Sequence, residues 1–161
     1  MASLTQKAFL VIVVSFFLTI PSLSLSVPQK PMLPGDNVPA FVKANMANTM
    51  AKTKEFIQNV IVKKLAASAT MDHLHKDCLK TCKEVYEDAI DAMKKATQDV
   101  TEENYYKANV DLSAMLSFIE TCNDCTVAAN GNDIAFQNFQ KWTQGIASDC
   151  LDKVSKKYYK N

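Results

Sequence analysis

Cys78-Leu-Lys-Thr-Cys82 and Cys122-Asn-Asp-Cys125 enclose the stretch of sequence that decides the fold. Between these two cysteine pairs lie two runs with helical periodicity, separated by the polar residues 97–101. The cysteines of a pair are four or three residues apart, so both lie on one face of a helix. The stretch therefore predicts a helical hairpin with cysteines on both of its helices.

The residue numbers also predict which cysteines pair. In an antiparallel hairpin, the numbers of residues at the same level have a nearly constant sum. This sum is 204 for Cys82 with Cys122 and 203 for Cys78 with Cys125, which places the turn beside the polar residues. The crossed pairing gives sums of 200 and 207 and puts the partners out of level by roughly 5 Å. Because a disulfide needs Cα atoms within about 7 Å, we predict the bonds Cys82–Cys122 and Cys78–Cys125.

Residues 1–26 have the layout of a secretory signal peptide. Lys7 precedes thirteen uncharged, mostly apolar residues, 8–20, and Pro21 and three serines follow. The alternative, a membrane anchor that stays attached, would need a longer apolar run. We predict cleavage after Ser24 or Ser26 and a secreted protein outside the cytosol, where disulfides form.

The charge of the mature chain excludes two kinds of partner. Removing Lys7 leaves 17 lysines against 17 acidic residues (18 − 1 against 17), and the chain has no arginine. Binding to nucleic acid or to anionic membranes needs a basic excess. We therefore expect neither a nucleic acid nor a membrane as partner.

The composition and periodicity predict one helical domain. Residues 27–40 contain four prolines and a glycine, which predicts an extended arm. Residues 41–161 contain four amphipathic runs, and residues 68–72 are placed to cap the second of them. Asp99, with Glu102 three residues later, is the predicted cap of the third. The expected fold is all-α, an up-down-up-down four-helix bundle whose second and third helices are cross-linked by disulfides.

Two motifs resemble a known family. Residues 82–93, Cys-Lys-Glu-Val-Tyr-Glu-Asp-Ala-Ile-Asp-Ala-Met, resemble the C-x-x-x-Y-x-x-A-x-D-x-L helix of plant invertase and pectin methylesterase inhibitors. Residues 112–116 and 121–124, Leu-Ser-Ala-Met-Leu and Thr-Cys-Asn-Asp, are similar to the S-A-A-L…T-C-x-D stretch of that family. The resemblance covers roughly residues 45–158.

The resemblance implies a fold and a function. Members of this family are secreted four-helix bundles, and by the resemblance Cys82–Cys122 is the family's bond between the second and third helices. It implies an inhibitor that docks on a plant cell-wall pectin methylesterase or invertase as a 1:1 complex and covers the substrate cleft. Such a protein is not an enzyme and needs neither catalytic residues nor a cofactor.

The sequence departs from the family pattern in three places. No cysteine precedes Cys78, so the disulfide of the family's N-terminal hairpin is missing, and the proline-rich arm stands in its place. Cys78 and Cys125 add a bond that the pattern does not require. The Pro-Lys-Phe tripeptide of invertase inhibitors is absent, which favours a pectin methylesterase as the target.

Eight residues of the predicted hairpin are candidates for contact with the target. They are expected to face outward: Lys83, Glu84, Glu87, Asp88, Asp91, Tyr105, Tyr106 and Asp111. Glu84, Glu87, Asp88 and Asp91 form what we call the acidic stripe, which by our hypothesis meets a basic rim on the target enzyme. The alternative is a solvated helix face with charge pairs between neighbouring turns.

Other functional readings find less support. His75, Cys78 and Cys82 lie on one helix face, and Cys122 or Cys125 would complete a zinc site. Cysteines of a secreted chain that are placed to pair form disulfides instead, so no metal is expected. The chain contains no nucleophile elbow, zinc-protease or phosphate-loop motif.

Cys150 remains after the four hairpin cysteines are paired. It lies about twelve residues out of level with Cys122 in the predicted bundle, roughly 18 Å along the axis. We expect a monomer in which Cys150 is a small buried thiol, or a dimer linked through this cysteine.

Two other functions stay open: a secreted carrier of an apolar ligand, and a signalling or defence protein without inhibitory activity.

Overall fold

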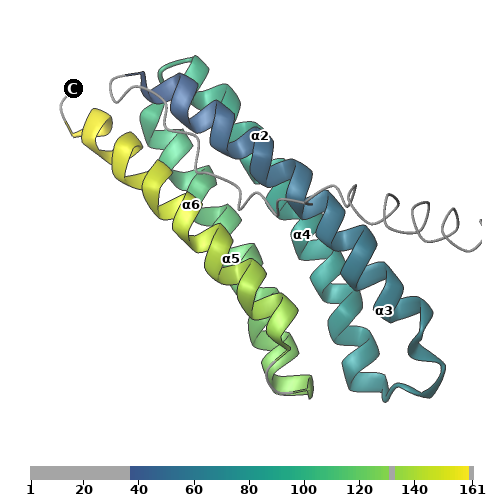
Figure 1. Ribbon diagram of the computed structural model, residues 1–161. Helices are drawn as coiled ribbons and strands as arrows, with labels where there is room; N and C mark the ends of the chain where they lie inside the picture. The colour runs from purple at the N-terminus through teal and green to yellow at the C-terminus, as the bar shows by residue number, and fades with distance from the viewer. Residues whose placement is uncertain (1–36, 131–132, 160–161) are drawn as a thin grey trace, which may run out of the picture. The chain divides into compact units, whose positions relative to one another are not determined.

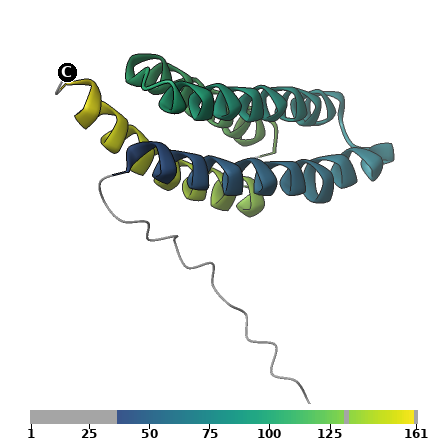
Figure 2. The ribbon, with the colours of Figure 1, turned by 90° about the horizontal axis from the view of Figure 1, so that it is seen from above.

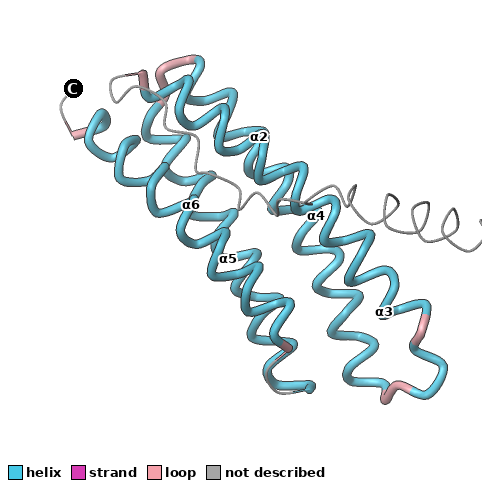
Figure 3. Tube along the Cα trace, in the orientation of Figure 1, coloured by secondary structure: helices cyan, strands magenta, loops and turns pink. Residues whose placement is uncertain are grey.

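All regular structure in the described part of the chain is helical (Figure 3). The computed structural model describes residues 37–130 and 133–159. The first bundle helix consists of α2 (Val38–Phe56), η1 (Ile57–Val62) and α3 (Lys63–Ala66), and it is followed by the short η2 (Ser68–Thr70), α4 (His73–Thr101), α5 (Tyr105–Asn130) and α6 (Ile134–Tyr158).

Consecutive helices run in opposite directions (Figure 1). α4 packs against α2 and α5, and α6 packs against α5 and α2. Figure 2 shows these helices as two layers, α4 with α5 and α2 with α6. The predicted four-helix bundle is therefore confirmed.

The first helix begins earlier than its apolar pattern suggested. It starts at Val38 instead of Phe41, because the Asn37 side chain accepts a hydrogen bond from the Ala40 amide at 3.0 Å. Pro39 is tolerated in the first helical turn, where its missing N–H has no intrahelical partner to lose. The signal peptide predicted for residues 1–26 lies outside the described residues, as does most of the predicted arm. None of the helices in residues 37–130 and 133–159 is long and apolar enough to cross a membrane.

The first helix changes its winding where its buried face would otherwise turn away from the core. Thr49, Thr53, Ile57 and Ile61 are buried and four residues apart. On a regular α-helix such residues drift about 40° around the axis at each step. The wider π turns of η1 reduce this drift, so that Ile57 and Ile61 both face the core.

Three buried polar side chains of α2 satisfy their hydrogen bonds within the helix. Asn45 Nδ2 donates to the Phe41 carbonyl at 2.9 Å. The hydroxyls of Thr49 and Thr53 donate to carbonyls four residues earlier, both at 2.8 Å. Because these groups are paired locally, the core tolerates them without a polar partner on another helix.

Two disulfides join α4 to α5. The inner disulfide, Cys82–Cys122, has its Cα atoms 4.6 Å apart, and the outer disulfide, Cys78–Cys125, 5.7 Å apart. Both fall in the range that a disulfide needs. The second and third bundle helices are therefore cross-linked as predicted.

The turn between α4 and α5 corrects the predicted helix cap. α4 continues to Thr101, so Asp99 lies inside its last turn, only 8% exposed. The cap of α5 is Asn104, whose side chain accepts a hydrogen bond from the Lys107 amide at 3.2 Å. Glu103 adopts a left-handed conformation (φ 57°), and the Asn104 amide bonds back to the Asp99 carbonyl at 2.8 Å. This is the bond that closes a helix C-terminus when the following residue is left-handed.

Asp99 faces another acid. Burial raises its pKa, and a hydrogen bond with the Asp111 carboxyl on α5, together with the charge of that carboxyl, raises it further. The charges of Lys107 and Glu102 act in opposite directions on the same group. The α4–α5 interface thus contains two neighbouring acids, and this proximity makes Asp99 harder to ionise than a free aspartate.

Removing the disulfides should lower the free energy of unfolding unequally. With Cys78→Ala and Cys125→Ala the inner disulfide still closes the hairpin, so we expect a loss of about 2–3 kcal/mol from the small ring between the two bonds. Replacing all four cysteines also opens the long loop, which costs about 4 kcal/mol more. Urea denaturation monitored by circular dichroism measures both values. Equal losses of unfolding free energy in the two variants would contradict the view that the inner disulfide closes the long loop.

Asp99→Asn should stabilise the protein at pH 7. The pKa of Asp99 is raised in the folded state. Its contribution to the free energy of unfolding is therefore complete only when the pH is below the pKa that Asp99 has in the unfolded chain. That contribution is lost as the pH rises through the folded pKa. The increase in unfolding free energy caused by Asp99→Asn should therefore shrink as the pH is lowered from 7 to 3. Urea denaturation at several pH values in this range measures it.

Asp91→Asn is the matched control. A hydrogen bond from Lys94 lowers the pKa of this exposed carboxyl. Its contribution is therefore present at neutral pH and lost in acid, the opposite sign from Asp99. A gain at pH 7 in both variants would mean that the acid pair is not its cause.

Candidate functional site

The eight predicted contact residues lie on two surfaces. Lys83, Glu84, Glu87, Asp88 and Asp91 lie on α4 between its ends, whereas Tyr105, Tyr106 and Asp111 lie on the first turns of α5. The two groups therefore need separate descriptions.

Half of the acidic stripe is neutralised by lysines of the same helix. Lys83 Nζ lies 2.8 Å from Glu87 Oε1, and Lys94 Nζ lies 2.7 Å from Asp91 Oδ1. These are exposed pairs between neighbouring helical turns, which contribute little stability. They do reduce the charge that Glu87 and Asp91 present to a partner. This much agrees with the alternative of a solvated, charge-paired face.

Glu84 and Asp88 form the other half of the stripe. Both are exposed, they lie one turn apart, and neither makes an ion pair or a hydrogen bond with the described residues. Two adjacent carboxylates without a counter-charge leave a local negative potential. The part of the stripe that offers net charge is therefore the pair Glu84 and Asp88.

A shallow groove of about 250 Å³ runs between the first bundle helix and α4. Its lining residues are Lys54, Ile57, Gln58, Glu87, Ile90, Asp91 and Lys94. The lysine-paired carboxylates border this groove, whereas Glu84 and Asp88 do not. The two halves of the stripe therefore face different surroundings.

Two of the three candidates on α5 are less accessible than expected. Tyr105 is only 8% exposed, and burial, with the charge of Glu103 as a smaller cause, raises its pKa. Asp111 is half-buried beside Asp99. The expectation that these two side chains face outward is wrong, because both lie on the side of α5 that packs in the bundle. Tyr106, by contrast, is 60% exposed.

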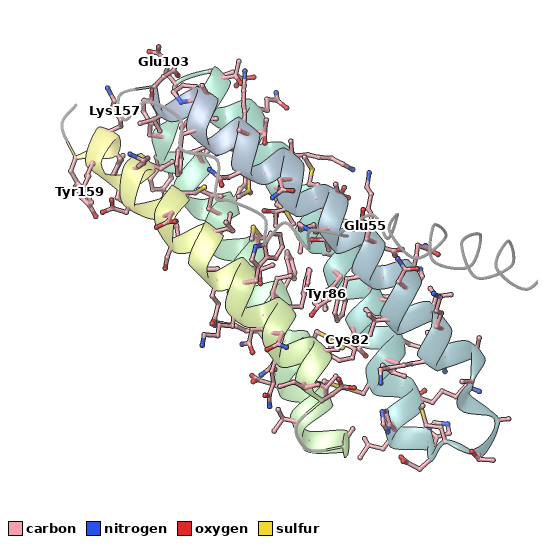
Figure 4. All side chains as sticks on the ribbon, viewed as in Figure 1. Glu55, Cys82, Tyr86, Glu103, Lys157 and Tyr159 are labelled. Atoms are coloured by element: carbon pink, nitrogen blue, oxygen red, sulfur yellow. A yellow bond between two sulfur atoms is a disulfide. The ribbon has the colours of Figure 1, made fainter. Side chains whose placement is uncertain are left out.

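Tyr106 has neighbours that the sequence analysis did not single out. Its ring centroid lies 5.7 Å from that of Tyr158, whose centroid lies 4.9 Å from that of Tyr159. Figure 4 shows Glu103, Lys157 and Tyr159 at this same end of the bundle. The sequence did contain one sign of this cluster, because two tyrosines follow Val154, the last buried apolar residue of α6. The sequence alone does not show that α6 ends beside the start of α5.

The cysteines do not form a metal site. Cys78 and Cys82, the proposed partners of His75, are both in disulfides. Within residues 37–130 and 133–159, no group of three or more histidine, cysteine or acidic side chains is arranged to hold a metal ion. Cys150 lies on α6 with no exposed surface. A bond from its sulfur to a second chain would therefore require the core to open.

Tyr86, from the family-like motif, belongs to the core. Its ring packs against Phe56 of α2 and Phe139 of α6, with centroid distances of 5.9 and 5.4 Å. Its hydroxyl is buried without a hydrogen-bond partner in the described residues, and burial raises its pKa. Figure 4 shows Tyr86 one turn from Cys82, within the bundle. Tyr86 thus packs in the core and takes no part in a binding surface.

Comparison with known proteins agrees with this architecture. The model of the plant invertase/pectin methylesterase inhibitor family matches residues 21–156. The match begins before the described residues and includes the predicted arm. A search of curated protein sequences finds no match.

Two solved structures share the fold. A pectin methylesterase inhibitor from Arabidopsis thaliana has 17% sequence identity and a TM-score of 0.65, and the match covers 95% of this chain and 89% of that one. A mutant form of a pectin methylesterase inhibitor from Arabidopsis has 22% identity and a TM-score of 0.62, and the match covers 74% of this chain and 78% of that one. The family match over most of the chain, the helical bundle and the cross-linked α4 and α5 lead to one conclusion: the chain belongs to the plant invertase/pectin methylesterase inhibitor family.

Proposed function

We propose that this protein is a secreted inhibitor of a plant cell-wall pectin methylesterase. The observation that carries the proposal is the family match across residues 21–156. The likeness in fold to two proteins described as pectin methylesterase inhibitors supports it. An acid invertase is the second candidate target, less favoured because the chain lacks the Pro-Lys-Phe tripeptide.

Inhibition in this proposal is steric. The bundle docks as a rigid body in a 1:1 complex and covers the substrate cleft, so it needs no catalytic side chain or cofactor and is not an enzyme. Rigid docking loses little conformational entropy at the interface. The two disulfides between α4 and α5 hold the backbone beneath the docking face in one arrangement.

The docking face is proposed to be the outer surface of α4. Glu84 and Asp88 supply its uncompensated charge, and they would meet lysines or arginines at the rim of the enzyme's cleft. Charge complementarity of this kind speeds association and selects the partner. Lys83, Glu87 and Asp91 lie at the edge of this face with their charges already paired. Tyr105, Tyr106 and Asp111 are assigned no part in it.

Secretion completes the proposal. The signal peptide of residues 1–26 directs the chain to the cell wall, where oxidising conditions form the disulfides and where the target enzyme acts. The mature protein works there as a monomer.

The proposal is tested with the mature, oxidised protein against a plant pectin methylesterase and an acid invertase in parallel. We expect stoichiometric inhibition of the pectin methylesterase. Inhibition of the invertase alone would assign the other target. If neither enzyme is inhibited, the proposal is wrong; an apolar compound recovered by solvent extraction would then support a carrier, and binding to membrane extracts a signalling protein.

Reversing the charges of Glu84 and Asp88 should weaken inhibition. Glu84→Lys with Asp88→Lys replaces attraction to a basic rim by repulsion, and we expect the inhibition constant to rise at least about tenfold. The loss should appear mainly in the association rate and should shrink at high salt.

The matched control is Glu55→Lys with Asp124→Lys. These acids lie on other helices, are also exposed and make no ion pair with the described residues, and their reversal changes the net charge equally. We expect this variant to inhibit like the unmodified protein. If both variants lose inhibition equally, the net charge of the protein is the cause rather than the position of Glu84 and Asp88. If neither variant loses inhibition, the outer surface of α4 is not part of the interface.

A further inference from the structure

The end of the bundle at the α4–α5 turn carries a hollow that lies away from the proposed docking face. Its volume is about 480 Å³, within the range of about 300–1,000 Å³ typical of small-molecule sites. We call it the tyrosine hollow, and it is lined by Glu102, Glu103, Asn104, Tyr105, Tyr106 and Tyr158. It exists because α5 begins where α6 ends, which brings residues far apart in sequence together (Figure 1).

Two of the three tyrosines that line the hollow are exposed, and their rings contact each other. Tyr106 is 60% exposed and Tyr158 42%, and their planes meet at 41°. Tyr105 also lines the hollow but is almost fully buried. Single exposed aromatic residues are common, but adjacent rings from two helices around a concavity mark a surface suited to a ligand. Each exposed ring offers a flat apolar face beside a hydroxyl that forms hydrogen bonds.

The polar groups of the hollow are mainly acceptors. Glu102 and Glu103 are exposed, and neither is paired with a lysine of the described residues. The Glu102 carboxylate accepts one hydrogen bond, from Gln98 Nε2 at 2.8 Å. Because a carboxylate accepts several hydrogen bonds, both side chains retain capacity for donors from a ligand.

We propose that the tyrosine hollow binds a pyranose ring of an uncharged oligosaccharide. The C–H face of such a ring is apolar with a small positive partial charge, which suits the negative face of an aromatic ring. The sugar's hydroxyl groups donate to the carboxylates of Glu102 and Glu103. This ligand goes beyond the proposed inhibition, because it gives the protein a carbohydrate contact of its own.

The charge of the hollow determines which sugar it accepts. Two carboxylates without counter-ions repel an acidic polysaccharide, whereas an esterified one has no charge to repel. Methyl-esterified galacturonan oligomers should therefore bind more tightly than the same oligomers after de-esterification. A basic peptide is the competing occupant, because lysines pair with carboxylates and also stack on tyrosine rings.

The test is a titration of isotope-labelled mature protein, followed by backbone amide shifts in NMR spectra. Methyl-esterified galacturonan oligomers should cause saturable shifts at Tyr106 and Tyr158, and de-esterified oligomers should bind at least about threefold more weakly. Tyr106→Ala with Tyr158→Ala should weaken binding about tenfold or more. Glu102→Gln with Glu103→Gln should remove the preference for the esterified form.

Leu74→Ala is the control variant. Leu74 is a large, exposed apolar residue in the first turn of α4, at the opposite end of that helix from the hollow. Its loss should leave binding unchanged. In each variant, the chemical shifts of residues far from the mutation show whether the fold is intact. If the double alanine variant is misfolded, Tyr106→Phe with Tyr158→Phe takes its place. This variant keeps both rings and should retain binding.

Three results would overturn the proposal. They are the absence of saturable shifts with either oligosaccharide, undiminished binding by a folded variant without both rings, and shifts at the hollow with a lysine-rich peptide alone. The titration contains no enzyme, so its outcome is independent of whether the protein inhibits a pectin methylesterase.

Discussion

The cross-link between α4 and α5 is the constraint on which the rest of the bundle depends. Cys82–Cys122 and Cys78–Cys125 hold the two helices at one level, with Cα separations of 4.6 and 5.7 Å. With the helices held at this level, the chain reverses within residues 102–104, and near the turn Asp99 of α4 forms a hydrogen bond with Asp111 of α5. The apolar faces of the two helices then form one surface, against which α2 and α6 pack.

Three buried polar side chains of α2 find their hydrogen-bond partners within that helix. Asn45, Thr49 and Thr53 bond to carbonyls of their own helix, so their burial imposes no demand on a neighbour. Tyr86 fills space among Phe56, Phe139 and the surrounding apolar residues, while its hydroxyl remains without a partner in the described residues. Such a core is stabilised by packing, and packing resists deformation when a partner docks.

Function is proposed for two surfaces that differ in chemistry. The outer face of α4 offers charge, concentrated on Glu84 and Asp88 because lysines neutralise Glu87 and Asp91. The tyrosine hollow offers aromatic faces with carboxylates at its rim. An exposed charged helix face suits a protein partner, and an aromatic concavity suits a small ring. The bundle keeps the two surfaces apart, so one protein has room for both ligands at once.

The order of the helices, the level of the cysteines and the family all followed from the sequence, because each depends on local spacing. The cysteine sums placed the turn within two residues of its position, and helical periodicity located the four helices. Tertiary structure decided what depends on neighbours distant in the chain: the burial of Asp99 and Tyr105, and the meeting of Tyr106 with Tyr158. Periodicity gives the face of a helix but not the helix opposite it, and therefore the tyrosine hollow became visible only once α5 and α6 were packed together.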